Sequence, residues 1–224
     1  MYILNNLSNK EWDNFLDNSN QNNIFCSSRY LNLLNENYIN VVMVDKNDNP
    51  IIGIIIFEDD LYLKKVPAIF NGVILNKKYD KPSNVVKISE TFINLLANKF
   101  QGFRLKVHYN FSDIRGFQWF NYFESDRKKF KISIFYTGIL NLSNKEILNK
   151  NINKGRMHSI NKAIKNNYRS IISDEIKILD ELHDYTFKKQ NIKRTKNEIY
   201  FSNELAKKTI GEGFGKLLIT INEK

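Results

Sequence analysis

The sequence predicts an α+β (α/β-like) fold, in which helices pack on a central sheet. Two runs of mostly apolar residues, at 38–45 and 51–58, flank a turn-forming segment, as in a pair of strands. A strong amphipathic helix pattern begins at Ser83. The order of two helices and a strand that opens the chain recurs after Leu142. The 224 residues, 42% of them hydrophobic, are enough to form a buried core.

The N-terminal part is expected to contain two helices. Ser8 and Glu11 form a capping box, and apolar residues follow at helical spacing, so the first helix is predicted at about 10–17. Ser27 or Ser28 caps a second helix, which carries tyrosine and leucine side chains.

The strands at 38–45 and 51–58 are expected to form a hairpin, because the segment between them is rich in Asn and Asp and ends in Pro50. The second strand is nearly all apolar, which is typical of a central strand covered on both faces. Gly53 within it indicates a bulge.

The rest of the first domain alternates strands and helix. The helix that begins at Ser83 should end near Lys99, where a glycine follows shortly. The segment 113–122 is aromatic and irregular. Further strands are predicted at 66–74, 103–109 and 130–140.

After Leu142 the pattern restarts with a second capping box, Ser143 to Glu146, which opens a short helix. This restart predicts a first domain at 1–142 and an incomplete second domain with a basic helical connector at 143–224, a repeat of architecture and not of sequence. Its expected elements are a basic helix at 156–166, a strand at 168–172, helices at 174–190 and 198–208, and a strand at 215–221.

The net charge of +10 is uneven along the chain. Residues 1–142 hold 17 basic and 14 acidic groups, net +3, whereas residues 143–224 hold 17 and 10, net +7. Such a surface is suited to RNA, phosphorylated cofactors or anionic lipid. The alternative is that the lysines keep a Lys- and Asn-rich protein soluble, and the sequence leaves both readings open.

Several classes of protein are disfavoured. A single cysteine, Cys26, excludes a disulfide framework within the chain and a Cys-rich metal site. The three histidines lie far apart and show no metal-ligand spacing, so no metal is expected. The apolar stretches have the length of strands, so no transmembrane segment is expected. No secretory signal is visible, and the expected location is cytoplasmic.

Several motifs follow one another along the chain in a distinctive order. They are Trp12-x-x-Phe15, the segment 24–31, the segment 113–122, the segment 136–142, and Arg156-x-x-x-Ile160-Asn-Lys162-Ala163-x-Lys165. In this order and spacing they resemble the FemA/FemB-type branch of the GNAT-like acyltransferases, which carry two tandem GNAT-like domains. The resemblance implies a mixed, mostly antiparallel central sheet flanked by helices, followed by the start of a second GNAT-like unit that is apparently truncated.

The resemblance also implies an activity. It implies an N-acyltransferase that moves an acyl or aminoacyl group onto an amine of a small-molecule or cell-wall precursor, in cell-envelope or sugar metabolism, by direct attack. The donor would be an acyl-CoA or an aminoacyl-tRNA, and the basic part of the chain is compatible with either. Two alternatives stay open. One is a truncated, non-catalytic protein completed by an oligomer or a partner chain, and the other is a basic module that binds RNA.

The candidate substrate-binding residues lie in two places. By resemblance, Asp113, Arg115, Trp119 and Tyr122 would line the substrate cleft. Arg156 and Lys162 lie on the basic helix, six residues apart and therefore on different faces. No residue is assigned as catalytic.

Four further features of the sequence have a structural explanation beside a functional one. Cys26 is expected to be buried packing, and His108 a core or sheet histidine with a general base as the alternative. The segment 211–215 is glycine-rich but precedes a strand, so a turn is expected and not a phosphate loop. The tightest basic cluster is either a phosphate contact or an ordinary exposed loop; it comprises Lys188, Lys189, Lys193, Arg194 and Lys196.

Overall fold

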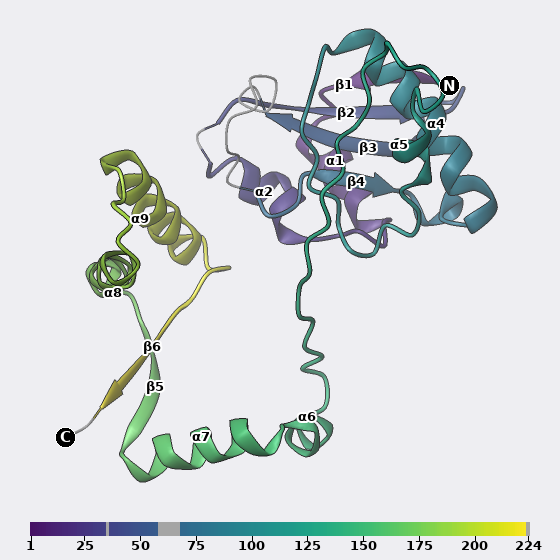
Figure 1. Cartoon of the computed structure of the whole chain (residues 1–224). Helices are drawn as coiled ribbons and strands as arrows, with labels where there is room; N and C mark the ends of the chain where they lie inside the picture. The colour runs from purple at the N-terminus through teal and green to yellow at the C-terminus, as the bar shows by residue number, and fades with distance from the viewer. Residues whose placement is uncertain (35, 58–67, 223–224) are drawn as a thin grey trace. The chain divides into compact units, whose positions relative to one another are not determined.

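The computed structural model describes residues 1–34, 36–57 and 68–222 (Figure 1). The chain divides into two compact units, Met1–Ser133 and Ile134–Lys224. The segment 134–142, which the sequence analysis placed in the first domain, therefore groups with the second unit.

The first unit is built on a four-stranded antiparallel sheet in the order β1-β2-β3-β4 (Figure 1). The mixed α+β class is confirmed, and β2 and β3 form the expected hairpin, in which Tyr38 pairs with Phe57. The short strand β1, which was not predicted, pairs antiparallel with β2. The strands are β1 (Tyr2–Asn5), β2 (Tyr38–Val44), β3 (Pro50–Phe57) and β4 (Gly72–Leu75).

Gly53 in β3 is needed because α1 (Asn9–Asp17) packs directly over it. A Cβ atom at Gly53 would lie 3.1 Å from the Phe15 ring and 3.2 Å from the Trp12 ring. The pairing of β3 with β4 also shifts register between Gly53 and Ile54, which confirms the irregularity expected there. The capping box predicted at Ser8 is present at the start of α1.

The other face of the sheet is covered by α4 (Pro82–Lys99). The buried face of α4, which includes Phe92 and Leu96, forms one hydrophobic cluster with Ile52, Ile54 and Ile56 of β3. These isoleucines alternate with Gly53, which faces α1, so β3 is covered on both faces as expected. The short helices of this unit are η1 (Ile24–Cys26), α2 (Ser28–Leu31), η2 (Lys77–Tyr79) and α5 (Arg115–Trp119).

The strand predicted at 103–109 does not form a ladder. It makes a single parallel bridge, between Val107 and Gly72 of β4. The side chain of Asn71 replaces the rest of the ladder: its Nδ2 donates to the carbonyl oxygens of Ile55 and Arg104, both at 3.0 Å, and its Oδ1 accepts from the Lys106 N–H at 2.7 Å. One asparagine thus joins this segment to β3.

Gln21 has the same role at the other end of β4. Its side chain is fully buried, and its Oε1 accepts from the Leu75 N–H at 3.0 Å and from the Ser19 hydroxyl at 3.0 Å. Its Nε2 donates to the carbonyl oxygen of Asn110 at 3.0 Å. Gln21 therefore ties the loop after α1 both to β4 and to the segment that follows Val107.

The prediction of a long strand at 130–140 is wrong, because residues 127–142 form neither helix nor strand. Phe130 is anchored, with its ring centroid 5.6 Å from those of Phe103, Phe117 and Phe120. Beyond it, Phe135 and Tyr136 are at least 90% exposed. A strand is stabilised by its partners more than by its own sequence, and none of the described strands pairs with this segment.

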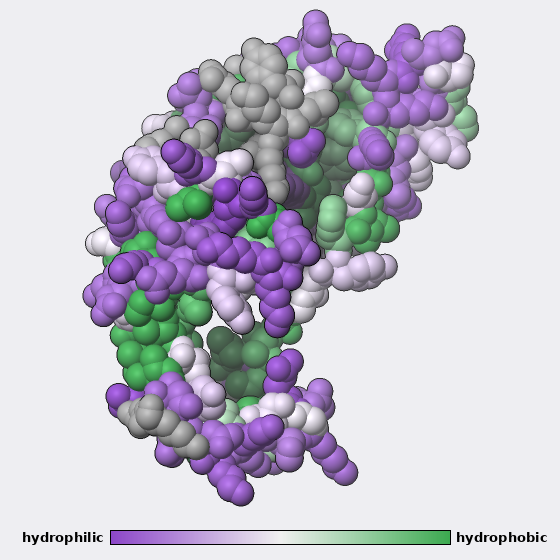
Figure 2. All heavy atoms as spheres, turned by 60° about the vertical axis from the view of Figure 1, so that its left-hand side comes forward, coloured by the Kyte–Doolittle hydropathy of each residue, from purple (hydrophilic) through white to green (hydrophobic). Residues whose placement is uncertain are grey.

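The second unit consists of four helices and a two-stranded antiparallel sheet, β5-β6, in the part of it that the structure describes. In the register of this sheet Tyr168 pairs with Asn222. Ile219 is the one large apolar side chain classed as buried among the described residues of this unit. Figure 2 shows hydrophobic residues at the molecular surface beside hydrophilic ones. The elements are α6 (Lys145–Asn151), α7 (Lys154–Lys165), β5 (Tyr168–Ser173), α8 (Ile176–Lys189), α9 (Lys196–Gly211) and β6 (Leu217–Asn222).

Replacement of Gln21 by alanine is expected to destabilise the first unit by roughly 3 kcal/mol, because the Leu75 N–H and the Asn110 carbonyl lose a buried partner. Urea unfolding followed by the fluorescence of the buried Trp12 measures this change. The matched control is Asn22→Ala, at an exposed neighbour, which should change the stability by less than about 0.5 kcal/mol. Equal stability of the two variants would contradict the role given to Gln21.

Candidate functional site

The first candidate site is the short segment that contains Asp113, Arg115 and Trp119. The guanidinium of Arg115 donates to both carboxylate oxygens of Asp113, with Nε–O distances of 3.0 and 2.9 Å and an Nη2–Oδ2 distance of 2.6 Å. The same guanidinium lies over the Trp119 ring, 5.5 Å from its centroid. The structure therefore brings these three predicted residues together. We call this group the Arg115 cluster.

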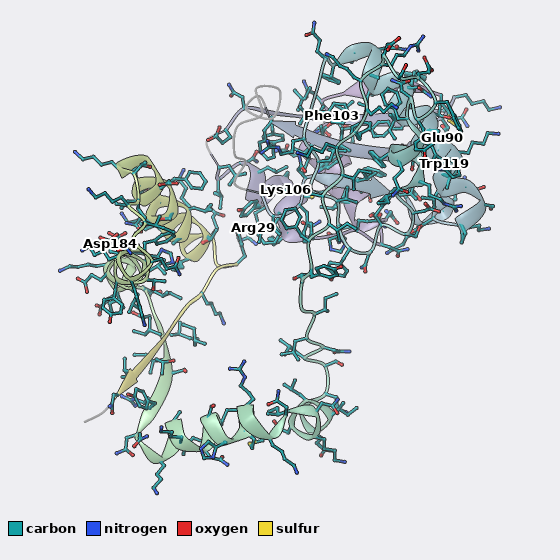
Figure 3. All side chains as sticks on the ribbon, viewed as in Figure 1. Arg29, Glu90, Phe103, Lys106, Trp119 and Asp184 are labelled. Carbon is teal, nitrogen blue, oxygen red and sulfur yellow. The ribbon has the colours of Figure 1, made fainter. Side chains whose placement is uncertain are left out.

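The scaffold of the Arg115 cluster is α5, which packs tightly on α4. A Cβ atom at Gly116 would lie 2.6 Å from the Ser89 side chain, so only glycine allows this approach. Phe117 of α5 is buried in the core. Figure 3 shows Trp119 on α5 beside Glu90 of α4.

The electrostatics of the Arg115 cluster favour binding over proton transfer. The hydrogen bonds from Arg115 lower the pKa of the Asp113 carboxyl below its usual value, so this group is ionised at neutral pH and is a poor general base. Arg115 is 52% exposed and Trp119 is 48% exposed. The cluster thus presents to solvent a half-exposed guanidinium that is paired with Asp113, and a half-exposed indole ring.

Tyr122 follows the cluster in the next turn. Its N–H donates to the carbonyl oxygen of Trp119 at 3.0 Å, and its side chain is 60% exposed. The ring contacts Phe123 and lies 6.0 Å from the Lys129 ammonium. Tyr122 is therefore a neighbour of the Arg115 cluster and has its own ring contacts.

His108 lies in an aromatic stack next to the bridge between Val107 and Gly72. The ring is 4.6 Å from Phe70 and 4.1 Å from Tyr109, between ring centroids. Burial lowers the pKa of His108, and its Nδ1 accepts from the Asn110 N–H at 3.1 Å. A neutral ring whose Nδ1 accepts carries its proton on Nε2, so His108 is a hydrogen-bond donor in this state and not a general base.

Cys26 is not suited to nucleophilic chemistry. Its thiol is fully buried, and burial raises the pKa of Cys26 to about 12. The Sγ atom lies 3.5 Å from the carbonyl oxygen of Phe70, to which it donates. Because the thiolate is the reactive form, this cysteine acts as packing, as expected.

Arg156 and Lys162 lie on α7 in the second unit, and both side chains are exposed. At about 100° per residue, their positions on the helix differ by roughly 120°, as the sequence analysis expected. They belong to a different unit from the Arg115 cluster, and each unit is described by itself.

Arg194 has a role that the sequence analysis did not find. It was grouped with exposed lysines, but its side chain is only 6% exposed and turns inward between α8 and α9. Its Nη1 donates to Asp180 at 2.9 Å and to Asp184 at 3.2 Å, and its Nη2 donates to the Ser202 hydroxyl at 2.9 Å. Arg194 is therefore a structural clamp between two helices and is not available to a phosphate. The i, i+4 spacing of the two aspartates was the available signal.

The glycine-rich segment 211–215 is a turn, as expected. Gly213 has a positive φ of 74°, and the N–H of Gly215 donates to the Thr209 carbonyl at 2.8 Å. These bonds cap the C-terminal end of α9, where the helix dipole disfavours an anion. Over the described residues, no group of three His, Cys, Asp or Glu side chains could hold a metal ion. No described helix is long and apolar enough to cross a membrane.

Comparison with known proteins gives one informative result. No protein-family model matches the chain, and no curated protein matches it at a significant level. Among solved structures, the crystal structure of FemX is similar, with a TM-score of 0.56 and 14% sequence identity. The chain has a Fem-like fold. The match covers 98% of this chain and 57% of the FemX chain, so the chain spans little more than half the length of FemX. At this identity the similarity is one of fold.

The buried Cys26 thiol is expected to resist alkylation by iodoacetamide at pH 8. A rise in pKa from 9.0 to about 12 lowers the thiolate fraction roughly a thousand-fold. Mass spectrometry of the native protein over time measures the rate. Two controls are the urea-unfolded chain and the native variant Ser125→Cys, which places a thiol at an exposed position. Alkylation of native Cys26 at the rate of either control would overturn the packing role.

Proposed function

We propose that the chain is an N-acyltransferase that moves an acyl or aminoacyl group onto a primary amine of a cell-envelope or sugar precursor. The amine nitrogen attacks the donor carbonyl carbon and forms the amide bond. The C–S bond of an acyl-CoA or the C–O bond of an aminoacyl-tRNA breaks, and the amine loses its proton as the thiol or hydroxyl leaves. The acceptor would be a cell-wall or amino-sugar precursor.

The observation that carries this proposal is the Fem-like fold across 98% of the chain. The sequence motifs that resemble the FemA/FemB-type acyltransferases point the same way. Because the chain spans 57% of the FemX length, the activity is a proposal for this chain and is not transferred from FemX.

The chemistry of the described residues is compatible with direct attack. A direct mechanism needs no covalent enzyme intermediate, and the one cysteine is buried and protonated. The Arg115 cluster offers two groups for recognition of an anionic or ring-containing acceptor: a half-exposed guanidinium, paired with Asp113, and a half-exposed indole ring. We therefore propose that the Arg115 cluster and its neighbour Tyr122 bind the acceptor. Arg156 and Lys162, on α7 of the second unit, stay predicted binding residues of that unit.

The donor is proposed as a class. Acyl-CoA and aminoacyl-tRNA are both polyanions, and the second unit has the excess of basic groups to attract either. No metal enters the proposed mechanism.

The second candidate is that the protein is not catalytic by itself. The exposed apolar side chains of the second unit favour this candidate. Among its described residues it buries one large apolar side chain, Ile219, and leaves many others exposed. Such a unit gains little from the hydrophobic effect unless another surface covers it. The binding experiment below separates the two candidates.

The experiment is the thermal unfolding of the full chain with acetyl-CoA, with alanyl-tRNA, or with neither. A donor that binds the folded state raises Tm by mass action, by several degrees at about 100 times its Kd. A rise with acetyl-CoA supports acyl transfer from CoA, and a rise with alanyl-tRNA supports aminoacyl transfer. A cooperative transition that neither donor shifts contradicts the proposal and favours the non-catalytic candidate.

Two matched variants test the Arg115 cluster. Arg115→Ala removes the cation from the Trp119 face and is expected to weaken acceptor binding, measured as a KM at least tenfold higher in the transfer assay. Arg127→Ala removes an exposed arginine that pairs with Glu124 in the same unit, and it should leave KM unchanged. Equal KM values for the two variants would remove the Arg115 cluster from the substrate site.

A further inference from the structure

The helix α7 lies in the longest strongly basic stretch of the chain. Residues 147–173 hold six basic groups and no acidic group. Four of the six, two on each half of the helix, belong to α7 itself. They are Lys154, Arg156, Lys162 and Lys165.

The apolar residues of α7 form a stripe between these basic groups. At about 100° per residue, Met157, Ile160 and Ile164 fall within an arc of roughly 60°. On the same count, Arg156 lies about 40° beyond one edge of this arc, and Lys154 lies about 60° beyond the other. Lys165 lies on the same side as Lys154. Basic side chains therefore flank the apolar stripe on both sides, while Lys162 points away from it.

The apolar stripe of α7 is not buried against any other element in the part of the chain that the structure describes. No residue of α7 is buried among the described residues, and Ile164 is 66% exposed and Ile160 38% exposed. The α7 ribbon in Figure 3 carries its side chains on all sides. The apolar stripe and its basic flanks are thus both presented to solvent.

We propose that α7 binds the surface of an anionic lipid bilayer. The helix would lie in the plane of the interface, with Met157, Ile160 and Ile164 at the boundary between headgroups and acyl chains. Lys154, Lys165 and Arg156 would extend along the helix flanks to the lipid phosphates, because their long apolar stems can lie against the stripe while the charge stays hydrated. An anionic bilayer thus offers phosphates to the basic side chains of α7 and acyl chains to its exposed apolar side chains.

The apolar stripe is what favours lipid over nucleic acid. A phosphate backbone attracts the lysines and arginine equally well, but it offers nothing to three adjacent aliphatic side chains. Recognition of single-stranded RNA commonly uses several exposed aromatic rings for stacking, and the one ring on α7 is that of His158. An exposed apolar stripe between two basic flanks is typical of an interfacial helix. Such a helix inserts its apolar stripe into the membrane and places its basic side chains at the lipid headgroups.

The test measures sedimentation of the full chain with sucrose-loaded vesicles. Vesicles of phosphatidylcholine with 30 mol% phosphatidylserine should bind the protein, pure phosphatidylcholine should not, and binding should fall as the salt concentration rises. This readout needs no transferase activity, so its failure and the failure of the proposed function are distinguishable.

Two double variants separate the contributions of charge and apolar insertion. Lys154→Gln with Lys165→Gln should lower the partition constant roughly 30-fold, from two lost charges near the surface. Ile160→Ser with Ile164→Ser should lower it by at least about tenfold without changing the charge. No α7 residue is buried, so both variants keep the described fold.

The controls carry the same changes on another helix of the same unit. Lys188→Gln with Lys189→Gln removes two exposed charges from α8, and Leu182→Ser with Tyr185→Ser removes two exposed apolar side chains from it. Both controls should bind vesicles within about twofold of the wild type. Three results would overturn the proposal. The first is no binding to the anionic vesicles, and the second is equal losses of binding in the variants and the controls. The third is a serine variant whose binding to vesicles and whose binding to tRNA both equal those of the wild type.

Discussion

The first unit depends on two buried amide side chains that replace main-chain pairing around β4. Asn71 joins β3 to the segment at 104–106, and Gln21 joins the loop after α1 to β4 and to Asn110. A carboxamide can donate and accept at once, so one such residue satisfies several buried backbone groups that would otherwise each cost about 1–3 kcal/mol. This arrangement lets the chain run parallel to β4 at a single bridge and then turn away.

The placement of the candidate site follows from that constraint. After the bridge at Val107, the chain passes through the His108 stack and reaches α5, where Gly116 presses against α4. Arg115 and Trp119 are thereby held at the surface of a packed core instead of on a free loop. A rigid support of this kind is what a binding site needs, since it limits the entropy that substrate binding would cost.

Local features could be predicted from the sequence, and non-local ones could not. The capping box at Ser8 and the hairpin of β2 and β3 depend on neighbouring residues and were predicted correctly. The capping box expected at Ser143 is wrong, because Asn144 caps α6, and the box at Thr195 was not predicted. The strand β1 was not predicted because its partner strand lies about 40 residues away in the sequence. The prediction of a strand at 130–140 was wrong because strand propensity does not supply a partner strand. The ion pair of Asp113 with Arg115 was not predicted, although both residues were named as site residues, and the Arg194 clamp needed the tertiary arrangement of α8 and α9.

The central proposal is that this chain, with its Fem-like fold, transfers an acyl group to an amine. The most direct measurement is product detection by mass spectrometry after the full chain is incubated with acetyl-CoA or alanyl-tRNA and an amine acceptor, either an amino sugar phosphate or a lysine-containing muropeptide. We expect a new amide whose formation requires protein, donor and acceptor together. Loss of the donor's acyl group at the same rate with and without acceptor, and no amide product with either donor, would contradict it.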